Sequence, residues 1–175
     1  VDSTGGLLAA YRLQLRLLRL PAPECFMANE YDTALVYYTQ ALHIRRDCLG
    51  PNSLDYAATA FNAGQCYHQK GKLDDANDLY QEFLRVALMK YGRGHRDVAV
   101  VLSGMAQIFQ EKHQYDQALE LYEESLSAGR EALGDDHTEI AMLYNRLGNF
   151  NFERGRLEYA LKCYLQGRAI EKKVL

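Results

Sequence analysis

The segment Tyr115–Ser125 reads YDQALELYEES, and it recurs along the chain at intervals of 42 residues. The preceding copies begin at Leu73 and Tyr31, and a later copy begins at Leu157. Two positions hold the same residue in every copy, an alanine at positions 34, 76, 118 and 160 and a tyrosine at positions 38, 80, 122 and 164. A fixed period of this length predicts an array of stacked structural repeats.

Small residues mark a second set of aligned positions between these copies. The aligned sets are Gly50, Gly92 and Gly134, and Gly64, Ala106 and Gly148. Gly71 and Gly155 align with each other and provide a second break in the period. Because glycine commonly ends helices, each period contains two segments separated by turns. The sequence therefore predicts an all-α fold built from antiparallel helix pairs.

The apolar residues between the breaks follow helical spacing. The first segment places its apolar residues on one face, at Tyr31, Ala34, Leu35, Tyr38, Ala41 and Leu42. We expect helices over residues 31–49, 56–70, 74–91, 97–112, 116–133, 139–154 and 156–175. Asn52 or Ser53 is expected to cap the second of these helices and the pair Asp135-Asp136 the sixth.

The N-terminal part departs from the repeat, and we divide the chain into two regions. Residues 1–27 are expected to form a tail and a capping amphipathic helix, in which Arg12, Arg16 and Arg19 share one face. This helix either covers the open apolar end of the first repeat or binds a membrane or a partner. Residues 28–175 are expected to form the array, with repeat boundaries near 72, 114 and 156.

Composition restricts the classes of partner. The 175-residue chain carries a net charge of −3, which gives no electrostatic reason to bind nucleic acid or an anionic membrane. It contains no apolar run long enough to cross a membrane. Four cysteines lie far apart and form no metal-ligand pattern, which favours reduced thiols and a cytoplasmic location.

The aligned residues resemble the tetratricopeptide repeat (TPR) family over roughly residues 28–175. The period of 42 exceeds the usual 34 residues and resembles the kinesin light chain subgroup. The linker Leu133-Gly134-Asp135-Asp136-His137, followed by Ala141, is similar to that subgroup's linker. The resemblance implies a right-handed superhelical solenoid of about 3.5 repeats plus an N-terminal helix.

The sequence shows no catalytic or cofactor motif. His95 and His137 recur because the linker recurs, and they are interpreted as loop or helix-start residues. His43 and Cys48 share a helix but have no third group to orient them. We therefore expect a protein that is not an enzyme and that holds no cofactor or metal.

The resemblance places the inner wall of the solenoid on the first helix of each repeat. The predicted peptide-binding residues on that wall are Phe61, Gln65, His68, Ser103, Gln107, Gln110, Asn145, Asn149 and Phe152. Gln65, Gln107 and Asn149 form a ladder of amides that can pair with an extended peptide backbone, or that simply keep an exposed face soluble. Val100 and Met142 also fall on the wall, and Arg146 lies at its border.

The sequence is consistent with two functions. The first is a protein–protein interaction scaffold that binds a partner peptide or helix in its concave groove. The alternative is a self-associating structural or regulatory segment of a larger protein, with a homo-oligomer formed through the terminal helices. The apolar edge of the last helix, at Leu161 and Leu165, favours the alternative.

Overall fold

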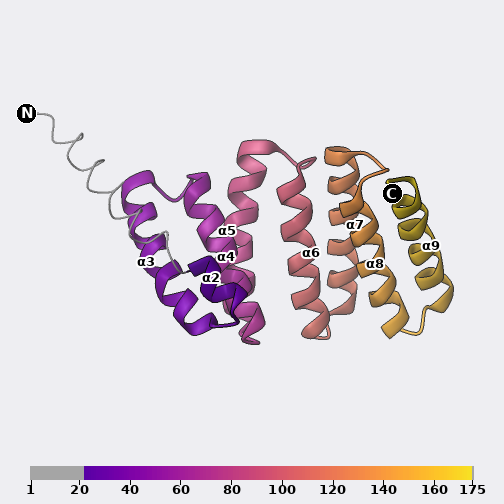
Figure 1. The fold of residues 1–175 in the computed structure, drawn as a ribbon, viewed down its shortest axis with the longest axis horizontal. Helices are drawn as coiled ribbons and strands as arrows, with labels where there is room; N and C mark the ends of the chain where they lie inside the picture. Colours follow the sequence, from indigo (N-terminus) through magenta and orange to yellow (C-terminus); the bar gives the residue numbers. More distant parts are fainter. Residues whose placement is uncertain (1–21, 175) are drawn as a thin grey trace, which may run out of the picture. The chain divides into compact units, whose positions relative to one another are not determined.

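The computed structural model describes residues 22–174, which form helices and no strand (Figure 1). The helices are α2 (Ala22–Met27), α3 (Tyr31–Leu49), α4 (Leu54–Gln69), α5 (Leu73–Tyr91), α6 (Arg96–Glu111), α7 (Tyr115–Leu133), α8 (Thr138–Glu153) and α9 (Leu157–Val174). The all-α prediction is confirmed. Residues 1–21, which hold most of the predicted tail and capping helix, lie outside the described residues.

The chain divides into two compact units within α5, between Val86 and Ala87. The first unit holds α2, α3, α4 and most of α5, and the second holds the end of α5 and α6 through α9. Within each unit, helices that follow one another in sequence lie side by side and run antiparallel (Figure 1). The expected stacking of helix pairs is therefore present in each unit.

The repeated alanine and tyrosine positions form the core of each unit. The alanines at 34, 76, 118 and 160 are at most 2% exposed. The tyrosines at 38, 80 and 122 are also buried, whereas Tyr164 on the last helix is half-buried. Close packing explains the small residues opposite them, since a Cβ on Gly148 would lie 2.7 Å from the Tyr164 ring.

The turns before the leading helices are fixed by side-chain caps. Ser53 Oγ accepts a hydrogen bond from the Tyr56 backbone N–H at 3.2 Å, as predicted. His95 and His137 cap α6 and α8, and the Nδ1 atom of each accepts from a backbone N–H two residues later at 3.2 Å. Their interpretation as helix-start residues is confirmed.

The prediction that Asp135 and Asp136 cap α8 is wrong. His137 takes the cap position because its extended backbone (φ −120°, ψ 141°) leads directly into the helix, which leaves both aspartates in the loop. Asp135 instead pairs with Arg130, and Asp136 accepts from Lys173 Nζ at 2.8 Å. These ion pairs connect the loop to α7 and α9.

Candidate functional site

Two neighbouring cavities lie along α6 and α8 in the second unit. The larger has a volume of about 250 Å³ and is lined by Arg96, Ala99, Val100, Ser103, Gly129, Leu133, Glu139, Met142, Leu143 and Arg146. The smaller has a volume of about 180 Å³ and is lined by Gln107, Gln110, Glu111, Tyr122, Arg146, Asn149 and Glu153. Arg146 lines both cavities, and we call the two cavities together the α6–α8 groove.

The larger cavity is lined by exposed apolar side chains and by an ion pair. Val100 and Met142 occupy equivalent positions of successive repeats and are 40% and 51% exposed. Arg96 Nε donates to the carboxylate oxygens of Glu139 at 2.7 and 2.8 Å. The hydrogen bond from Arg96 lowers the pKa of Glu139. The charges of Arg96 and Glu139 thus neutralise each other at the N-terminal ends of α6 and α8, beside the apolar part of the lining.

Arg146 stands where the two cavities meet. Its Nη1 donates to Ser103 Oγ at 2.9 Å, and Ser103 itself is 1% exposed. Burial raises the pKa of Tyr122, which lines the smaller cavity, to about 12, and the charge of Arg146 opposes that rise. Arg146 therefore places a guanidinium in the middle of the groove while Ser103 holds it from behind.

The smaller cavity is lined by amides that bond to tyrosine hydroxyls from the core. Tyr122 Oη donates to Gln110 Oε1 at 2.9 Å, and Gln110 Nε2 donates to Glu153 Oε2 at 2.6 Å. Tyr164 Oη donates to Asn149 Oδ1 at 2.8 Å. The side-chain oxygens of Gln110 and Asn149 thus accept hydrogen bonds from the protein itself. The side-chain nitrogen of Asn149 is left to donate in the groove.

The predicted site residues fall into several environments. Gln107, Gln110 and Asn149 line the groove, and Ser103 lies in its floor. Asn145 Nδ2 instead donates to Glu171 Oε1 on α9 at 3.3 Å, and Phe152 is 59% exposed without lining either cavity.

The remaining predicted residues belong to the first unit. Phe61 is half-buried, with its ring stacked on Tyr80 at 5.3 Å and tilted against Phe83 at 5.1 Å. His68 meets the edge of the Tyr80 ring at 6.4 Å, and Gln65 is half-buried on the same helix. Phe61 and His68 therefore take part in packing around Tyr80.

The sequence prediction left Arg146 at the border of the wall and omitted Tyr122. The signal for Tyr122 was present, since the repeated tyrosine carries a hydroxyl that must find a partner when its ring is buried. Arg146 lies one residue beyond Asn145, and its long side chain reaches across to α6. Counting positions along one helix does not predict that a long side chain will contact a neighbouring helix.

Neither a metal-binding cluster nor a membrane-spanning helix occurs among the residues that the structure describes. Residues 22–174 contain no group of three or more His, Cys, Asp or Glu residues that could hold a metal ion. None of the helices within this range combines the length and apolar character needed to cross a membrane.

Comparison with solved structures identifies the same fold in kinesin light chain-like repeat proteins. BtubC (BKLC) from P. vanneervenii superposes with a TM-score of 0.84 at 19% identity, over 94% of this chain and 65% of that chain. The nearly identical TPR-like repeats of a Podosopora anserina protein assigned as a kinesin light chain give 0.72 at 18% identity, over 99% and 87%. At these identities the likeness shows the fold alone, and this chain spans less than two thirds of BtubC.

Sequence comparison gives the family. No curated protein matches the chain. The family model of the tetratricopeptide repeat matches residues 25–88 and 97–173, which together make up most of the 175 residues. The two matched stretches contain all the repeated alanines and tyrosines of the core. The chain therefore belongs to the tetratricopeptide repeat family.

Proposed function

We propose that this chain is a protein-interaction scaffold whose α6–α8 groove binds an extended segment of a partner protein. Repeats of this family generally mediate protein–protein interaction. The observation that carries the proposal is the pair Val100 and Met142, two exposed apolar residues in equivalent positions beside a cavity of about 250 Å³. Exposed apolar side chains around a depression are typical of an interaction site.

The size and lining of the groove favour a peptide over a small organic cofactor. Pockets for small ligands usually measure about 300–1,000 Å³, so the larger cavity suits a single apolar side chain. The amides of Gln107 and Asn149 lie further along the same groove. An amide can bond to the backbone of an extended chain whatever its sequence. A peptide would therefore place an apolar side chain by Met142 and its backbone beside the amides.

The experiment is a selection of peptides from a displayed random library, followed by affinity measurement. Met142→Glu should abolish binding of the selected peptides because it places a charge in the apolar wall. Met89→Glu is the matched control, because Met89 lies on α5 in the same unit, is 53% exposed and does not line the groove. Equal binding by both variants would contradict the proposal.

A second pair of variants tests the amides. Gln107→Ala combined with Asn149→Ala should weaken peptide binding while the helix content stays unchanged, because both side chains lie at the surface of the groove. Gln65→Ala, in the first unit, asks whether the third amide of the ladder contributes as well. Unchanged affinity in the double variant would assign these amides to solubility alone.

The proposal extends to the setting in which the chain acts. We infer a non-catalytic protein that needs no cofactor, binds neither nucleic acid nor membrane, and works in the cytoplasm. The family is typically a non-catalytic scaffold. The four cysteines are free, and Cys25 and Cys66 are buried without bonding to each other. Unpaired thiols are ordinary in a reducing compartment, which supports the location.

A further inference from the structure

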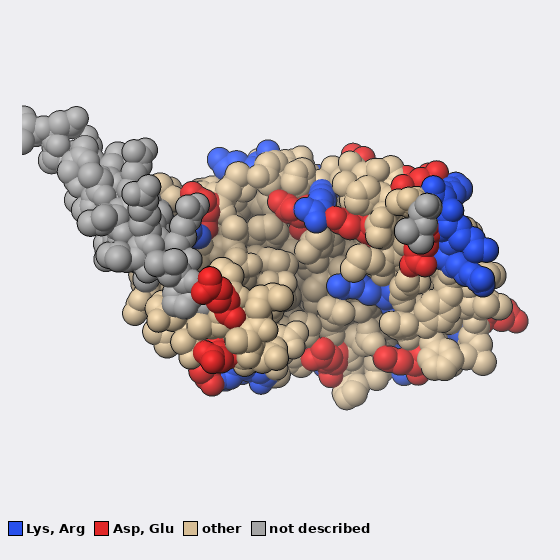
Figure 2. Space-filling model, in the orientation of Figure 1, with Lys and Arg blue, Asp and Glu red and all other residues tan. Residues whose placement is uncertain are grey.

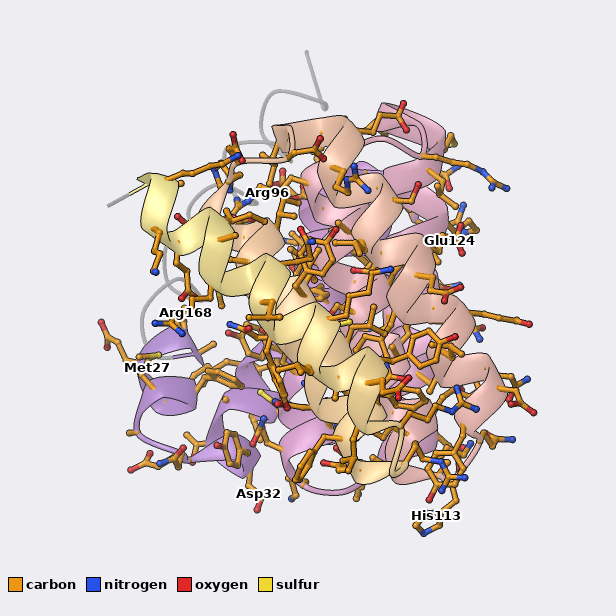
Figure 3. All side chains as sticks on the ribbon, turned by 90° about the vertical axis from the view of Figure 1, so that its right-hand side faces the viewer. Met27, Asp32, Arg96, His113, Glu124 and Arg168 are labelled. Carbon is orange, nitrogen blue, oxygen red and sulfur yellow. The ribbon has the colours of Figure 1, made fainter. Side chains whose placement is uncertain are left out.

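An apolar stripe lies on the outward side of α9. Leu157, Leu161 and Leu165 are 60%, 58% and 54% exposed. At 100° per residue they fall on one side of the helix together with Glu158 and Arg168. In Figure 3, α9 lies at the front of the second unit, and the labelled Arg168 projects away from the helix. We call these five residues the α9 stripe.

Two positions of the stripe differ from the surface that the same helix presents in the other repeats. Position 165 is exposed in every copy, but only here is it apolar, since the equivalent residues are Thr39, Gln81 and Glu123. Position 168 is the reverse, with a charged Arg168 where the other copies carry half-buried Leu42, Leu84 and Leu126.

This exchange changes what α9 can pack against. Leu126 belongs to α7 and packs against cores formed with α8, including Leu147 and Ile140. A further helix placed on α9 as α8 is placed on α7 would set its apolar side chains against the charge of Arg168. On α9 the leucine lies at position 165, whereas on α7 it lies at the position equivalent to 168. At positions 165 and 168 the stripe therefore departs from the pattern against which a repeat of the same kind packs.

The charges on the stripe indicate the direction of that occupant. Glu158 lies in the first turn of α9, while Arg168 and Lys172 lie near its end. Figure 2 shows Lys and Arg atoms gathered over the C-terminal part of α9, at the right of the view. A helix with one acidic and one basic end is complementary to a copy of itself running the opposite way, and two parallel copies would place like charges together.

We propose that two copies of this chain associate through α9 in an antiparallel, two-fold arrangement. Residues 158, 161, 165 and 168 have the alternating spacing of three and four that forms a seam between two helices. With the two-fold axis beside position 163, Leu161 faces Leu165 of the second copy, and Glu158 faces Arg168 of the second copy. Because the symmetry repeats each contact, the apolar centre is flanked at both ends by unlike charges.

The first test is the mass of the chain in solution, measured by sedimentation equilibrium over a concentration series. The unaltered chain should form a dimer as concentration rises, and Leu165→Glu should remain a monomer over the same series. Tyr159→Glu is the matched control, because Tyr159 is 66% exposed on α9 but lies off the stripe, and it should dimerise normally. A monomeric unaltered chain would overturn the proposal.

The second test determines the direction of the two helices. Glu158→Arg and Arg168→Glu should each weaken dimerisation roughly tenfold, since each creates two like-charge contacts. The double variant should restore it. Within one copy these residues are ten positions apart on the helix and cannot pair, so restoration requires contact between copies. Two weakened single variants without restoration would overturn the antiparallel arrangement.

The α9 stripe shares no residue with the groove. Met142→Glu, which is expected to abolish peptide binding, should leave dimerisation unchanged, because Met142 lies on α8 in the groove wall. Leu165→Glu should conversely leave peptide binding unchanged. Circular dichroism of each variant should match the unaltered chain, since every substituted residue on α9 is exposed.

Discussion

Two phenylalanines on α8, only two residues apart, should respond very differently to replacement by alanine. Phe150 is 1% exposed and packs with Ala106, Ala118 and Tyr122 in the core that joins α6, α7 and α8. Removing a buried phenyl ring leaves a cavity, so Phe150→Ala should lower the free energy of unfolding by about 3–5 kcal/mol. Phe152 is 59% exposed, and because full burial of a phenylalanine is worth about 1.5–3 kcal/mol, Phe152→Ala should lower it by roughly 1 kcal/mol.

Urea unfolding followed by circular dichroism measures both variants. A difference of about 3 kcal/mol between them corresponds to a difference in urea midpoint of roughly 1–3 M. Because repeat arrays can unfold unit by unit, the slopes of the transitions should be compared before free energies are extracted. Similar losses in the two variants would refute the placement of the core on the Phe150 side of α8.

Three further predictions concern groups in and near the core. Ser125→Ala should lower the free energy of unfolding by about 1 kcal/mol, because its buried hydroxyl donates to a backbone carbonyl of α6 at 2.7 Å, while the exposed Ser127→Ala should have almost no effect in the same urea assay. Burial raises the pKa of Tyr122 from 10.0 to about 12, so its stabilisation is complete below pH 10 and is lost as the pH rises toward 12. Tyr122→Phe should therefore lose less stability over that range in an alkaline titration, and an equal loss would contradict this account. Cys48 is exposed and should react with a thiol reagent in the folded protein, whereas Cys66, whose burial raises its pKa to about 11, should react only on unfolding.

The repeat period made the fold predictable from the sequence. Once Ala118 and Tyr122 were aligned with their copies, each helix inherited its buried face and its approximate bounds from the others. The error at Asp135 and Asp136 arose because aspartate is the commoner cap, whereas the backbone gives that position to His137. Helix bounds follow from periodicity, while the choice of cap depends on the conformation of one loop residue.

The groove was less predictable than the fold. Position counting identified Gln107 and Asn149, which line it. The same count included Asn145, whose side chain bonds to Glu171, and Phe152, which lies outside both cavities. A count of positions along one helix describes the direction of each Cβ, whereas the final contacts depend on side chains of neighbouring helices.

The hydroxyls of Tyr122 and Tyr164 bond to amide side chains at the groove, and these bonds determine which atoms of the amides can contact a partner. The side-chain oxygen of Asn149 already accepts a hydrogen bond from Tyr164, so its side-chain nitrogen is the atom that can bond to a partner. At Gln110 both ends are taken, by Tyr122 and by Glu153. Of these two amides, only the nitrogen of Asn149 is left to bond to a partner, and it is a hydrogen-bond donor. A bound strand would bring one of its backbone carbonyls to the Asn149 nitrogen on α8, so that this single contact would help to set the position of the strand along the helix.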